Sequence, residues 1–439
     1  MKISVFGTGY VGLVTSICFA DAGHSVTGID ISKSTIEKLS SGESTIYENG
    51  LVELLQKNLS SGMLKFSCEA EEGINESDII FVTVGSPTAN DGSTDLTLVF
   101  NAIDTISSNM ITYKLIVIKS TIPVGTTDTI KNRIAKKLKS RDVNIDFDVA
   151  YNPEFLREGC AISDCLDPYR IIIGSESDKA IGLLKSLYQL WLSKNTPFLI
   201  MPPASAEMTK YAANSMLATK ISLMNEISRL CEKTGANIDL VREGLGSDAR
   251  IGNHFLFAGL GYGGSCFPKD IEALIQTGRE HSEDLKILTA VAQTNIIQNQ
   301  FFLKKIITQI PDLKDKVITL WGAAFKPNTD DIREAPSLKL IKHFLTSGAA
   351  VHIFDPAATE NIKNYFNRNH KLTFFSDQYE ALKDADALII PTEWAHFQTP
   401  DFDRIKDSMK KPLVFDGRNI YSSAEMKKNG FEYFSIGRP

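Results

Sequence analysis

The chain has 439 residues, which is too long for one hydrophobic core and predicts two or three domains. Its formal net charge is −6 at pH 7 and its pI is about 5.8. This balance argues against nucleic acid or an anionic membrane as the main partner. No apolar run is long enough to cross a bilayer.

The six cysteines include no CxxC pair and show no zinc-ligand spacing, so we expect no metal site. Five of them are interpreted as small buried hydrophobic residues of a protein in the reducing cytoplasm. These five are Cys18, Cys68, Cys160, Cys165 and Cys231. The sixth, Cys266, lies in a glycine-rich segment.

Short apolar segments alternate with amphipathic ones in the first part of the chain. The strand candidates are 2–7, 25–30, 78–84, 115–120, 147–151, 170–174 and 197–201, and helix candidates such as 11–22 and 127–139 separate several of them. This alternation predicts a parallel sheet covered by helices on both faces, over a first domain at residues 1–203.

The segment from Ala204 to about Ile310 has a different character. A proline-free run of helix-forming residues, 205–235, and a second helical run, 284–309, predict an all-helical connector over 204–310. Alternation then returns, with strand candidates at 316–321, 350–355, 372–375, 385–391 and 412–416. The expected fold class is α/β, with two Rossmann-like doubly wound domains joined by a helical connector, the second domain covering 311–439.

Three glycines follow the first strand candidate at the spacing of a nucleotide-binding turn. Gly7 permits a tight turn, Gly9 lets a pyrophosphate approach the backbone, and Gly12 lets the next helix pack on the strand. Asp30 ends the second strand, where a carboxylate accepts a hydrogen bond from a ribose 2′-hydroxyl and repels a 2′-phosphate. The pattern predicts NAD in preference to NADP. A glycine-rich turn without a cofactor and an FAD site are the alternatives to this interpretation.

Polar residues also follow three other strand candidates. The turns are Thr83–Pro87, Lys119–Pro123 and Asn152–Gly159. Because ligands of doubly wound sheets bind at the carboxyl ends of the strands, we expect the first two turns to border the cofactor site, and the third places another acid, Glu154, at a strand's carboxyl end. Ordinary turn chemistry is the simpler explanation of the glycine and proline found there.

Residues 261–270, GYGGSCFPKD, place Cys266 in a glycine-rich turn shortly before Lys269 and Asp270. A thiol can capture an aldehyde and present it for a second oxidation, so this cysteine separates an alcohol dehydrogenase from one that makes an acid. Lys210 and Asn214 are four residues apart on the predicted connector helix and share one face. An ammonium and an amide placed together suit a developing oxyanion. A packed cysteine and a solvated helix face are the simpler interpretations.

Six segments together resemble the UDP-glucose/GDP-mannose dehydrogenase family over nearly the whole chain. In order they are GTGYVG, KSTIPVGT, NPEFLREG, SAEMTKYAAN, GYGGSCFPKD and AFKPNTDDIR. The FPKD sequence and Thr392-Glu393-Trp394 look like the UDP-glucose branch. The resemblance implies NAD-dependent, two-step, four-electron oxidation of UDP-glucose at C6 to UDP-glucuronate. It also implies a homodimer, because Arg250 matches a residue that reaches a neighbouring subunit's substrate.

The resemblance further implies a role for each matching residue. Cys266 matches the nucleophile that holds C6 as a thiohemiacetal and then as a thioester. Lys210 and Asn214 match groups that stabilise oxyanions. Thr121, Glu154 and Asp270 match residues of proton transfer and of the hydrolytic water, and the division of base roles among them stays open. The positions matched to the cofactor are Gly7, Gly9, Tyr10, Val11, Gly12, Asp30, Ser86, Thr121, Glu158, Lys269 and Arg333. Those matched to the substrate are Glu154, Phe155, Leu156, Lys210, Asn214, Arg250, Phe255, Gly259, Gly263 and Lys326.

Two alternatives to this function stay open. One is the same reaction on GDP-mannose or on a UDP-N-acetylhexosamine, and the other is an inactive nucleotide sensor that keeps the fold for binding. The chain departs from the family pattern at Thr35, Thr45, Asn49, Ser86 and Trp321, which concerns cofactor affinity and loop rigidity.

Overall fold

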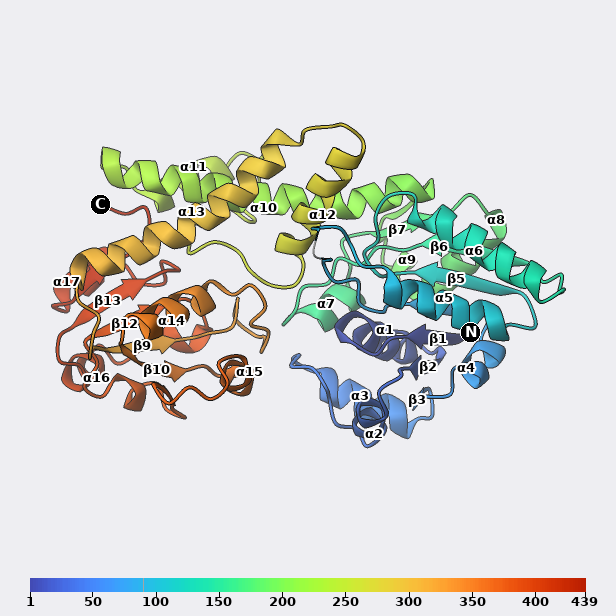
Figure 1. Ribbon diagram of the computed structural model, residues 1–439, viewed down its shortest axis with the longest axis horizontal. Coiled ribbons are helices and arrows are strands. Elements are labelled where there is room, and N and C mark those ends of the chain that lie inside the picture. The colour runs from blue at the N-terminus through green and yellow to red at the C-terminus, as the bar shows by residue number, and fades with distance from the viewer. Residues whose placement is uncertain (90) are drawn as a thin grey trace. The chain divides into compact units, whose positions relative to one another are not determined.

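Buried strands rich in valine, isoleucine and leucine build two sheets. The computed structural model describes residues 1–89 and 91–439, which divide into a first unit, Met1–Ala213, and a second unit, Asn214–Pro439. Each unit holds one sheet, and helix α10 (Pro203–Thr234) runs from the first unit into the second (Figure 1). The predicted α/β fold, with two Rossmann-like domains and a helical connection, is confirmed.

The first sheet has the strand order β3-β2-β1-β4-β5-β6-β7-β8. Its strands are β1 Lys2–Phe6, β2 Ser25–Ile29, β3 Leu64–Ser67, β4 Ile79–Val82, β5 Lys114–Ile118, β6 Phe147–Tyr151, β7 Ile171–Gly174 and β8 Phe198–Met201. The helices are α1 Tyr10–Asp21, α2 Lys33–Ser40, α3 Leu51–Ser60, α4 Ala70–Glu76, α5 Thr97–Asn109, α6 Thr126–Ser140, α7 Ala161–Leu166, α8 Asp178–Leu187 and α9 Gln189–Leu192.

Successive residues of each strand point to opposite faces of the sheet, and both faces are buried. In β4, Ile79 and Phe81 pack with Leu13 of α1, whereas Ile80 and Val82 pack in a second cluster with Val99 of α5. A strand buried on both faces reads as a continuous apolar run, which is why the sequence revealed it.

The structure corrects the expected all-parallel arrangement at one place. β6 pairs antiparallel with β7, through Tyr151 and Gly174, while β7 and β8 pair in parallel. A parallel return needs a crossover that usually contains a full helix. The segment between β6 and β7 forms instead a loop, 152–160, and the six-residue helix α7.

The second sheet has the order β11-β10-β9-β12-β13-β14 and is parallel throughout. Its strands are β9 Val317–Trp321, β10 Ala350–Phe354, β11 Leu372–Phe374, β12 Ala387–Ile390, β13 Leu413–Asp416 and β14 Glu432–Phe434. The helices of this unit after α10 are α11 Ile238–Gly246, α12 Phe267–Glu280, α13 Lys286–Gln309, α14 Pro336–Thr346, α15 Thr359–Tyr365, η1 Glu380–Leu382, η2 Ala395–Phe397, α16 Phe402–Ser408 and α17 Ser423–Lys428.

The helical segment α10–α13 belongs to the second unit for most of its length. Met224 of α10 and Phe302 of α13 lie in the same core as Ile318 and Leu320 of β9. Trp321 packs in a separate cluster with Leu388 of β12. Among the described helices, none combines the length and hydropathy that crossing a membrane requires.

Candidate active site

The turn after β1 has the geometry expected of a nucleotide-binding glycine motif. Gly7 adopts φ +91°, and its N–H donates to the Ile29 carbonyl at 2.8 Å. A Cβ on Gly12 would lie 1.8 Å from the Gly7 carbonyl oxygen, so only glycine allows α1 to pack here. A Cβ on Gly9 would meet nothing within 4 Å. Open space above Gly9, at the first turn of α1, therefore fits a pyrophosphate, and the residues present fit NAD.

Asp30 lies at the end of β2 beside this turn. One carboxylate oxygen accepts the Thr8 backbone N–H at 2.8 Å and the Thr8 hydroxyl at 3.0 Å, and the other accepts the Ser32 N–H at 3.0 Å. These bonds fix the carboxylate at the carboxyl end of the strand. There it can accept a bond from a ribose hydroxyl, and its charge opposes a 2′-phosphate.

The turns after β1, β4 and β5 are joined to one another by hydrogen bonds. The Thr83 hydroxyl donates to the Gly7 carbonyl at 2.8 Å, and the Ser120 hydroxyl donates to the Val84 carbonyl at 2.6 Å. Val11 lies in the first turn of α1, and Ser86 and Thr121 lie, partly buried, in the turns after β4 and β5. The structure thus gathers this group of predicted cofactor residues at one edge of the sheet.

Glu154 and Lys210 form a buried ion pair in the first unit. The Lys210 ammonium donates to the Glu154 carboxylate at 2.9 Å and to its carbonyl at 2.7 Å, and the two side chains are 3% and 8% exposed. Leu156 N–H donates to the other carboxylate oxygen at 2.7 Å. Burial acts to raise the pKa of Glu154, but Lys210, Leu156 and the nearby Lys119 outweigh it, so that its pKa lies below the ordinary value.

Lys119 is a second buried cation in this region. Its ammonium donates to the Asn152 side-chain oxygen at 3.1 Å, and the Tyr188 hydroxyl donates to the same oxygen at 2.7 Å. Burial lowers the pKa of Lys119. Phe155 lies next to Glu154, and its ring faces the Lys210 ammonium at 5.4 Å. Glu158 follows in the same loop and is partly buried.

In the second unit, Cys266 is the N-cap residue of α12 and is partly exposed. Its sulfur lies 3.6 Å from the Ser265 hydroxyl oxygen. In the first turn of the same helix, Asp270 is 1% exposed, accepts from the Asn214 amide at 2.6 Å and pairs with Lys269 at 2.8 Å. A thiol, a carboxylate, an amide and an ammonium are therefore organised by α12 and by Asn214 of α10.

The glycine-rich loop before Cys266 is held by close backbone contacts. A Cβ on Gly263 would lie 2.4 Å from the Glu334 carbonyl oxygen, and Gly264 has φ +84° with Phe325 packed against it. The Asn295 side chain accepts from Tyr262 N–H at 2.8 Å and donates to its carbonyl at 3.0 Å. The loop therefore cannot take side chains at these positions without moving.

The remaining predicted residues of the second unit lie on its loops. Arg250 pairs with Asp248 at 2.6 Å and is 88% exposed, and Arg333 pairs with Asp331 at 2.6 Å. The Lys326 ammonium lies 5.3 Å from the Phe325 ring centre. Phe255 has φ +63°, which is unusual for a bulky residue, and its ring contacts Phe267. Gly259 donates its N–H to the Asn225 side chain at 2.8 Å.

Known proteins match this chain over most of its length. Residues 1–192 match the NAD binding domain of the UDP-glucose/GDP-mannose dehydrogenase family, residues 204–296 its central domain, and residues 319–423 its UDP binding domain. A UDP-glucose 6-dehydrogenase of Pseudomonas aeruginosa is 42% identical, with 100% of this chain and 98% of that protein covered. A UDP-glucose 6-dehydrogenase of Bacillus subtilis is also 42% identical, with 100% and 93% covered.

The chain belongs to the UDP-glucose/GDP-mannose dehydrogenase family. It is an NAD-dependent dehydrogenase, as the glycine turn and Asp30 predicted. Among solved structures, a UDP-glucose dehydrogenase of Pyrobaculum islandicum superposes with a TM-score of 0.90 at 36% identity, covering 99% of this chain and 96% of that chain. A UDP-D-ManNAc dehydrogenase of Pyrococcus horikoshii gives 0.86 at 28% identity, covering 100% and 99%. Enzymes named for different sugars therefore share the fold.

Sequence reasoning missed Arg418, which joins three loops of the second unit of the dehydrogenase. Its guanidinium donates to the carbonyls of Pro391 at 2.7 Å, Gly261 at 3.2 Å and Phe325 at 3.4 Å. It also pairs with Glu393 at 3.1 Å. The only signal in the sequence is its place directly after a strand that ends in Asp416.

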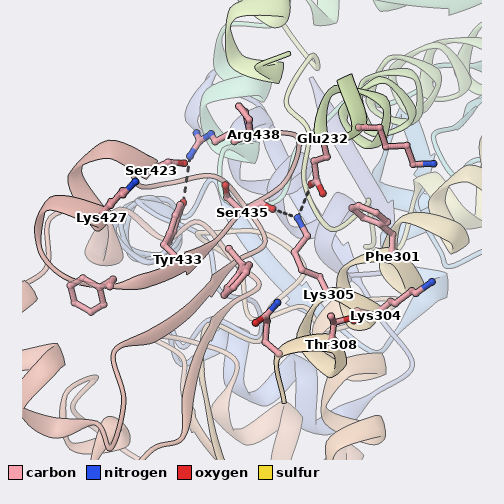
Figure 2. Close-up of a pocket in the computed structure, with 15 residues that line it drawn as sticks. Glu232, Phe301, Lys304, Lys305, Thr308, Ser423, Lys427, Tyr433, Ser435 and Arg438 are labelled. Atoms are coloured by element: carbon pink, nitrogen blue, oxygen red, sulfur yellow. Dashed lines mark hydrogen bonds and ion pairs between the residues drawn. The ribbon is translucent and has the colours of Figure 1, made fainter. Parts of the chain in front are cut away.

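A pocket of about 910 Å³ opens elsewhere on the second unit and contains none of the predicted site residues. Figure 2 shows Lys305 at its centre, between Glu232 and Ser435. Lys305 pairs with Glu232 at 2.7 Å and donates to the Ser435 carbonyl, and Glu232 also accepts the Gly437 N–H at 2.8 Å. These central groups hold the segment after β14 on α10 and α13.

One prediction about the cysteines is wrong. Cys160 is exposed, because it lies at the end of the loop 152–160, as the N-cap residue before the short helix α7. Cys18 and Cys231 are buried as expected, and Cys68 and Cys165 are partly buried. Within the described chain, no group of three or more histidine, cysteine and acidic residues is placed to hold a metal ion.

Proposed function

We propose that the protein oxidises UDP-glucose at C6 to UDP-glucuronate, with Cys266 as the nucleophile and NAD as the oxidant. The arrangement of Cys266, Asp270 and Asn214 around the start of α12 carries the proposal, since the second oxidation needs a thiol beside acid–base and amide groups. The UDP binding domain and the names of the full-length relatives support the substrate. The three-domain division 1–203, 204–310 and 311–439 remains part of the proposal.

NAD, which the residues around Gly7, Gly9 and Asp30 would hold, would accept one hydride from C6 in each of the two oxidations, so that two NAD molecules are consumed in turn for each sugar. Cys266 Sγ adds to the C6 aldehyde, giving a thiohemiacetal whose C6 still carries a hydrogen, and its oxidation leaves a thioester. Lys210 and Asn214 stabilise the C6 oxygen when it carries negative charge. A water then adds to the thioester and expels the Cys266 thiolate, and the water's proton passes to a base among Thr121, Glu154 and Asp270.

The remaining predicted residues fall into two groups. Gly7, Gly9, Tyr10, Val11, Gly12, Asp30, Ser86, Thr121, Glu158, Lys269 and Arg333 are proposed to serve the cofactor. Glu154, Phe155, Leu156, Lys210, Asn214, Arg250, Phe255, Gly259, Gly263 and Lys326 are proposed to serve the substrate. No disulfide joins the cysteines of the described chain, which supports a cytoplasmic location, because disulfides are rare there.

The stoichiometry of NADH tests the proposal. Purified protein is incubated with NAD and one limiting sugar nucleotide, and NADH and sugar acid are both quantified. We expect two NADH per UDP-glucose and little free aldehyde. Cys266→Ala should bind both ligands and form almost no UDP-glucuronate, whereas Cys231→Ala, a matched change in the core of the second unit, should leave the yield unchanged. One NADH per sugar, or faster turnover of GDP-mannose or a UDP-N-acetylhexosamine, would contradict it.

We also propose a homodimer formed through α10. Met216, Leu223 and Leu230 lie seven residues apart on this helix and are 63%, 52% and 55% exposed, so they form one apolar stripe. Exposed stripes of this kind mark protein interfaces. Leu223→Glu should convert a dimer into a monomer in analytical ultracentrifugation, while Lys136→Glu, an exposed charge change on α6, should not. A monomeric wild type would disprove the assembly.

A further inference from the structure

Glu48 is a buried carboxylate that the sequence analysis did not single out. It lies in the loop between α2 and α3, between Thr45 and Asn49, where the chain departs from the family pattern, and is 8% exposed. It accepts the backbone N–H of Gly159 at 2.7 Å and that of Ala161 at 2.8 Å. The Tyr10 hydroxyl donates to it as well.

Three separate segments of the first unit meet at this carboxylate. Tyr10 is the first residue of α1, directly after Gly9 of the nucleotide turn. Its hydroxyl oxygen also accepts the Gly159 N–H at 2.9 Å. Burial, and then the bond to Glu48, raise the pKa of Tyr10, so the hydroxyl keeps its proton and acts as a donor at neutral pH.

The segment held in this way, residues 152–160, contains Glu154 and Glu158. Lys210 fixes its beginning through Glu154, and Glu48 and Tyr10 fix its end through Gly159. Bonds from N–H and O–H donors to a buried carboxylate are short and charge-assisted, and removing one partner leaves a buried polar group without its bond. The nucleotide turn and the loop of glutamates are therefore joined by hydrogen bonds through one side chain.

We propose that Glu48 and Tyr10 are positioning residues that hold the 152–160 segment against the first turn of α1. The expected loss of turnover rests on the proposed function, whereas the expected release of the 152–160 segment does not. The two side chains act as one unit, so that loss of either should release the same loop.

Glu48→Gln, Tyr10→Phe and the double variant test the proposal. The first substitution keeps the shape of the side chain but replaces one acceptor oxygen with an amide nitrogen that cannot accept an N–H. The second removes the hydroxyl alone. Each single variant should lower kcat for UDP-glucose by about 10- to 100-fold. The double variant should be no slower than the slower single variant, because both substitutions disrupt the same hydrogen-bonded group of Glu48, Tyr10 and Gly159.

An activity-independent readout separates this proposal from the proposed function. Hydrogen–deuterium exchange of a peptide covering 152–161 should be faster in all three variants, with or without substrate. If wild type fails to oxidise UDP-glucose while exchange still rises in the variants, the function is wrong and the positioning role stands. If the wild type is active and the exchange is unchanged, the positioning role is wrong.

A matched control lies in the same unit. The Tyr113 hydroxyl donates to Asp148 at 2.7 Å, which gives the same tyrosine–carboxylate chemistry at the amino ends of β5 and β6. Tyr113→Phe should leave kcat within about threefold of wild type and should not change exchange of 152–161. An equal loss of turnover in this control would overturn the proposal, because it would show a general effect of destabilisation. If Glu48→Gln does not fold, Tyr10→Phe alone decides the outcome.

Discussion

The two sheets of the molecule share one plan and differ in how their first strand connects to the next helix. Both use the order 3-2-1-4-5-6 for their first six strands, and the residue after the first strand is a glycine at φ +91° (Gly7) or +93° (Gly322). Each glycine N–H donates to the second strand at 2.8 Å. After Gly7, α1 begins at Tyr10, whereas after Gly322 a long loop intervenes and α14 begins at Pro336.

The aspartates that follow the second strand of each sheet order, Asp30 after β2 and Asp355 after β10, also differ in their hydrogen bonds. Asp355 accepts four backbone N–H groups, from Ala323, Ala324, Ala357 and Ala358, and is 5% exposed. Asp30 accepts two backbone N–H groups and one hydroxyl, and is partly exposed. Asp355 therefore holds the loop after β9 in place, whereas Asp30 can still accept a hydrogen bond from a ligand. Strand order alone does not tell a dinucleotide site from another nucleotide site.

A cation follows the fifth strand in each sheet order. Lys119, after β5, donates to the Asn152 side chain, and Arg418, after β13, donates to three backbone carbonyls. The first sheet adds a second buried cation and a buried acid nearby, Lys210 and Glu154. We infer that the Lys210–Glu154 pair serves turnover, whereas Arg418 serves substrate binding.

Lys210→Ala should give the largest effect. Loss of one oxyanion donor lowers kcat by roughly 100- to 1000-fold, and the affinity for UDP-glucose should change far less. Steady-state kinetics with NAD and UDP-glucose measure both. Lys65→Ala, which removes an exposed pair with Glu76 at 2.9 Å, is the control and should match wild type. If Lys210→Ala raises KM and leaves kcat unchanged, the lysine serves substrate binding, and its proposed role in turnover is wrong.

Asp30→Asn and Asp355→Asn test the two acids directly. Wild type should prefer NAD over NADP by about 10- to 100-fold in kcat/KM, because Asp30 bonds one ribose and repels the phosphate of the other. Asp30→Asn should reduce this ratio, whereas Asp355→Asn should leave it unchanged and weaken the loop after β9. Equal efficiency of the wild type with both cofactors would overturn the assignment of Asp30.

Arg418→Lys should have a smaller effect, confined to binding. A lysine has no planar group that can donate to three carbonyls at once. The loops that carry Gly261, Phe325 and Pro391 would therefore no longer be joined by hydrogen bonds to one side chain. We expect KM for UDP-glucose to rise about tenfold with kcat nearly unchanged. Arg404→Lys, at an exposed pair with Asp377, should have no effect. A fall in kcat without a change in KM would show that Arg418 serves turnover and not substrate binding.

Sequence patterns located most strands because strands buried on both faces are continuous apolar runs. The missed strands are β3 and β14, which lie at the sheet edges, are short, and are partly exposed. Their sequences, LKFS and EYF, interrupt or precede the apolar residues with charged ones, so they carry no continuous apolar run, whereas the edge strand β8, FLIM, does and was found. The antiparallel pairing of β7 was missed for another reason, since sequence alone does not tell a loop with a short helix from a full crossover.

The sequence named candidate site residues one by one but gave no sign of how they pair. Glu154 and Lys210 were each predicted from motifs, but their separation of 56 residues gave no sign of an ion pair. Arg418 and Glu48 were missed because their partners are backbone groups of distant loops, which leave no pattern in side-chain identity. Tertiary contacts of this kind follow from the fold, and local spacing does not encode them.

The smallest expected effect concerns pH and compares one buried carboxyl from each unit. Burial acts to raise the pKa of Glu154, but Lys210, Leu156 and Lys119 outweigh it, so the pKa lies below its ordinary value of 4.5. In Asp416 the pKa lies above its ordinary value of 3.8, because burial outweighs the bonds from Tyr433, Arg418 and Tyr421. Folding therefore favours the charged form of Glu154 and the neutral form of Asp416.

Proton linkage then gives the two groups opposite signs. The stability that Glu154 contributes is present above pH 4.5 and is lost as pH falls through its lower folded pKa. The contribution of Asp416 is greatest below pH 3.8 and declines as pH rises toward its higher folded pKa. Thermal unfolding midpoints between about pH 3 and pH 7 measure both. We subtract the unfolding midpoint of each variant from that of the wild type at each pH. This difference should increase with pH for Glu154→Gln and should decrease with pH for Asp416→Asn. If both midpoint differences change in the same direction with pH, the pKa of one of the two carboxyls is shifted in the direction opposite to the one that its contacts indicate.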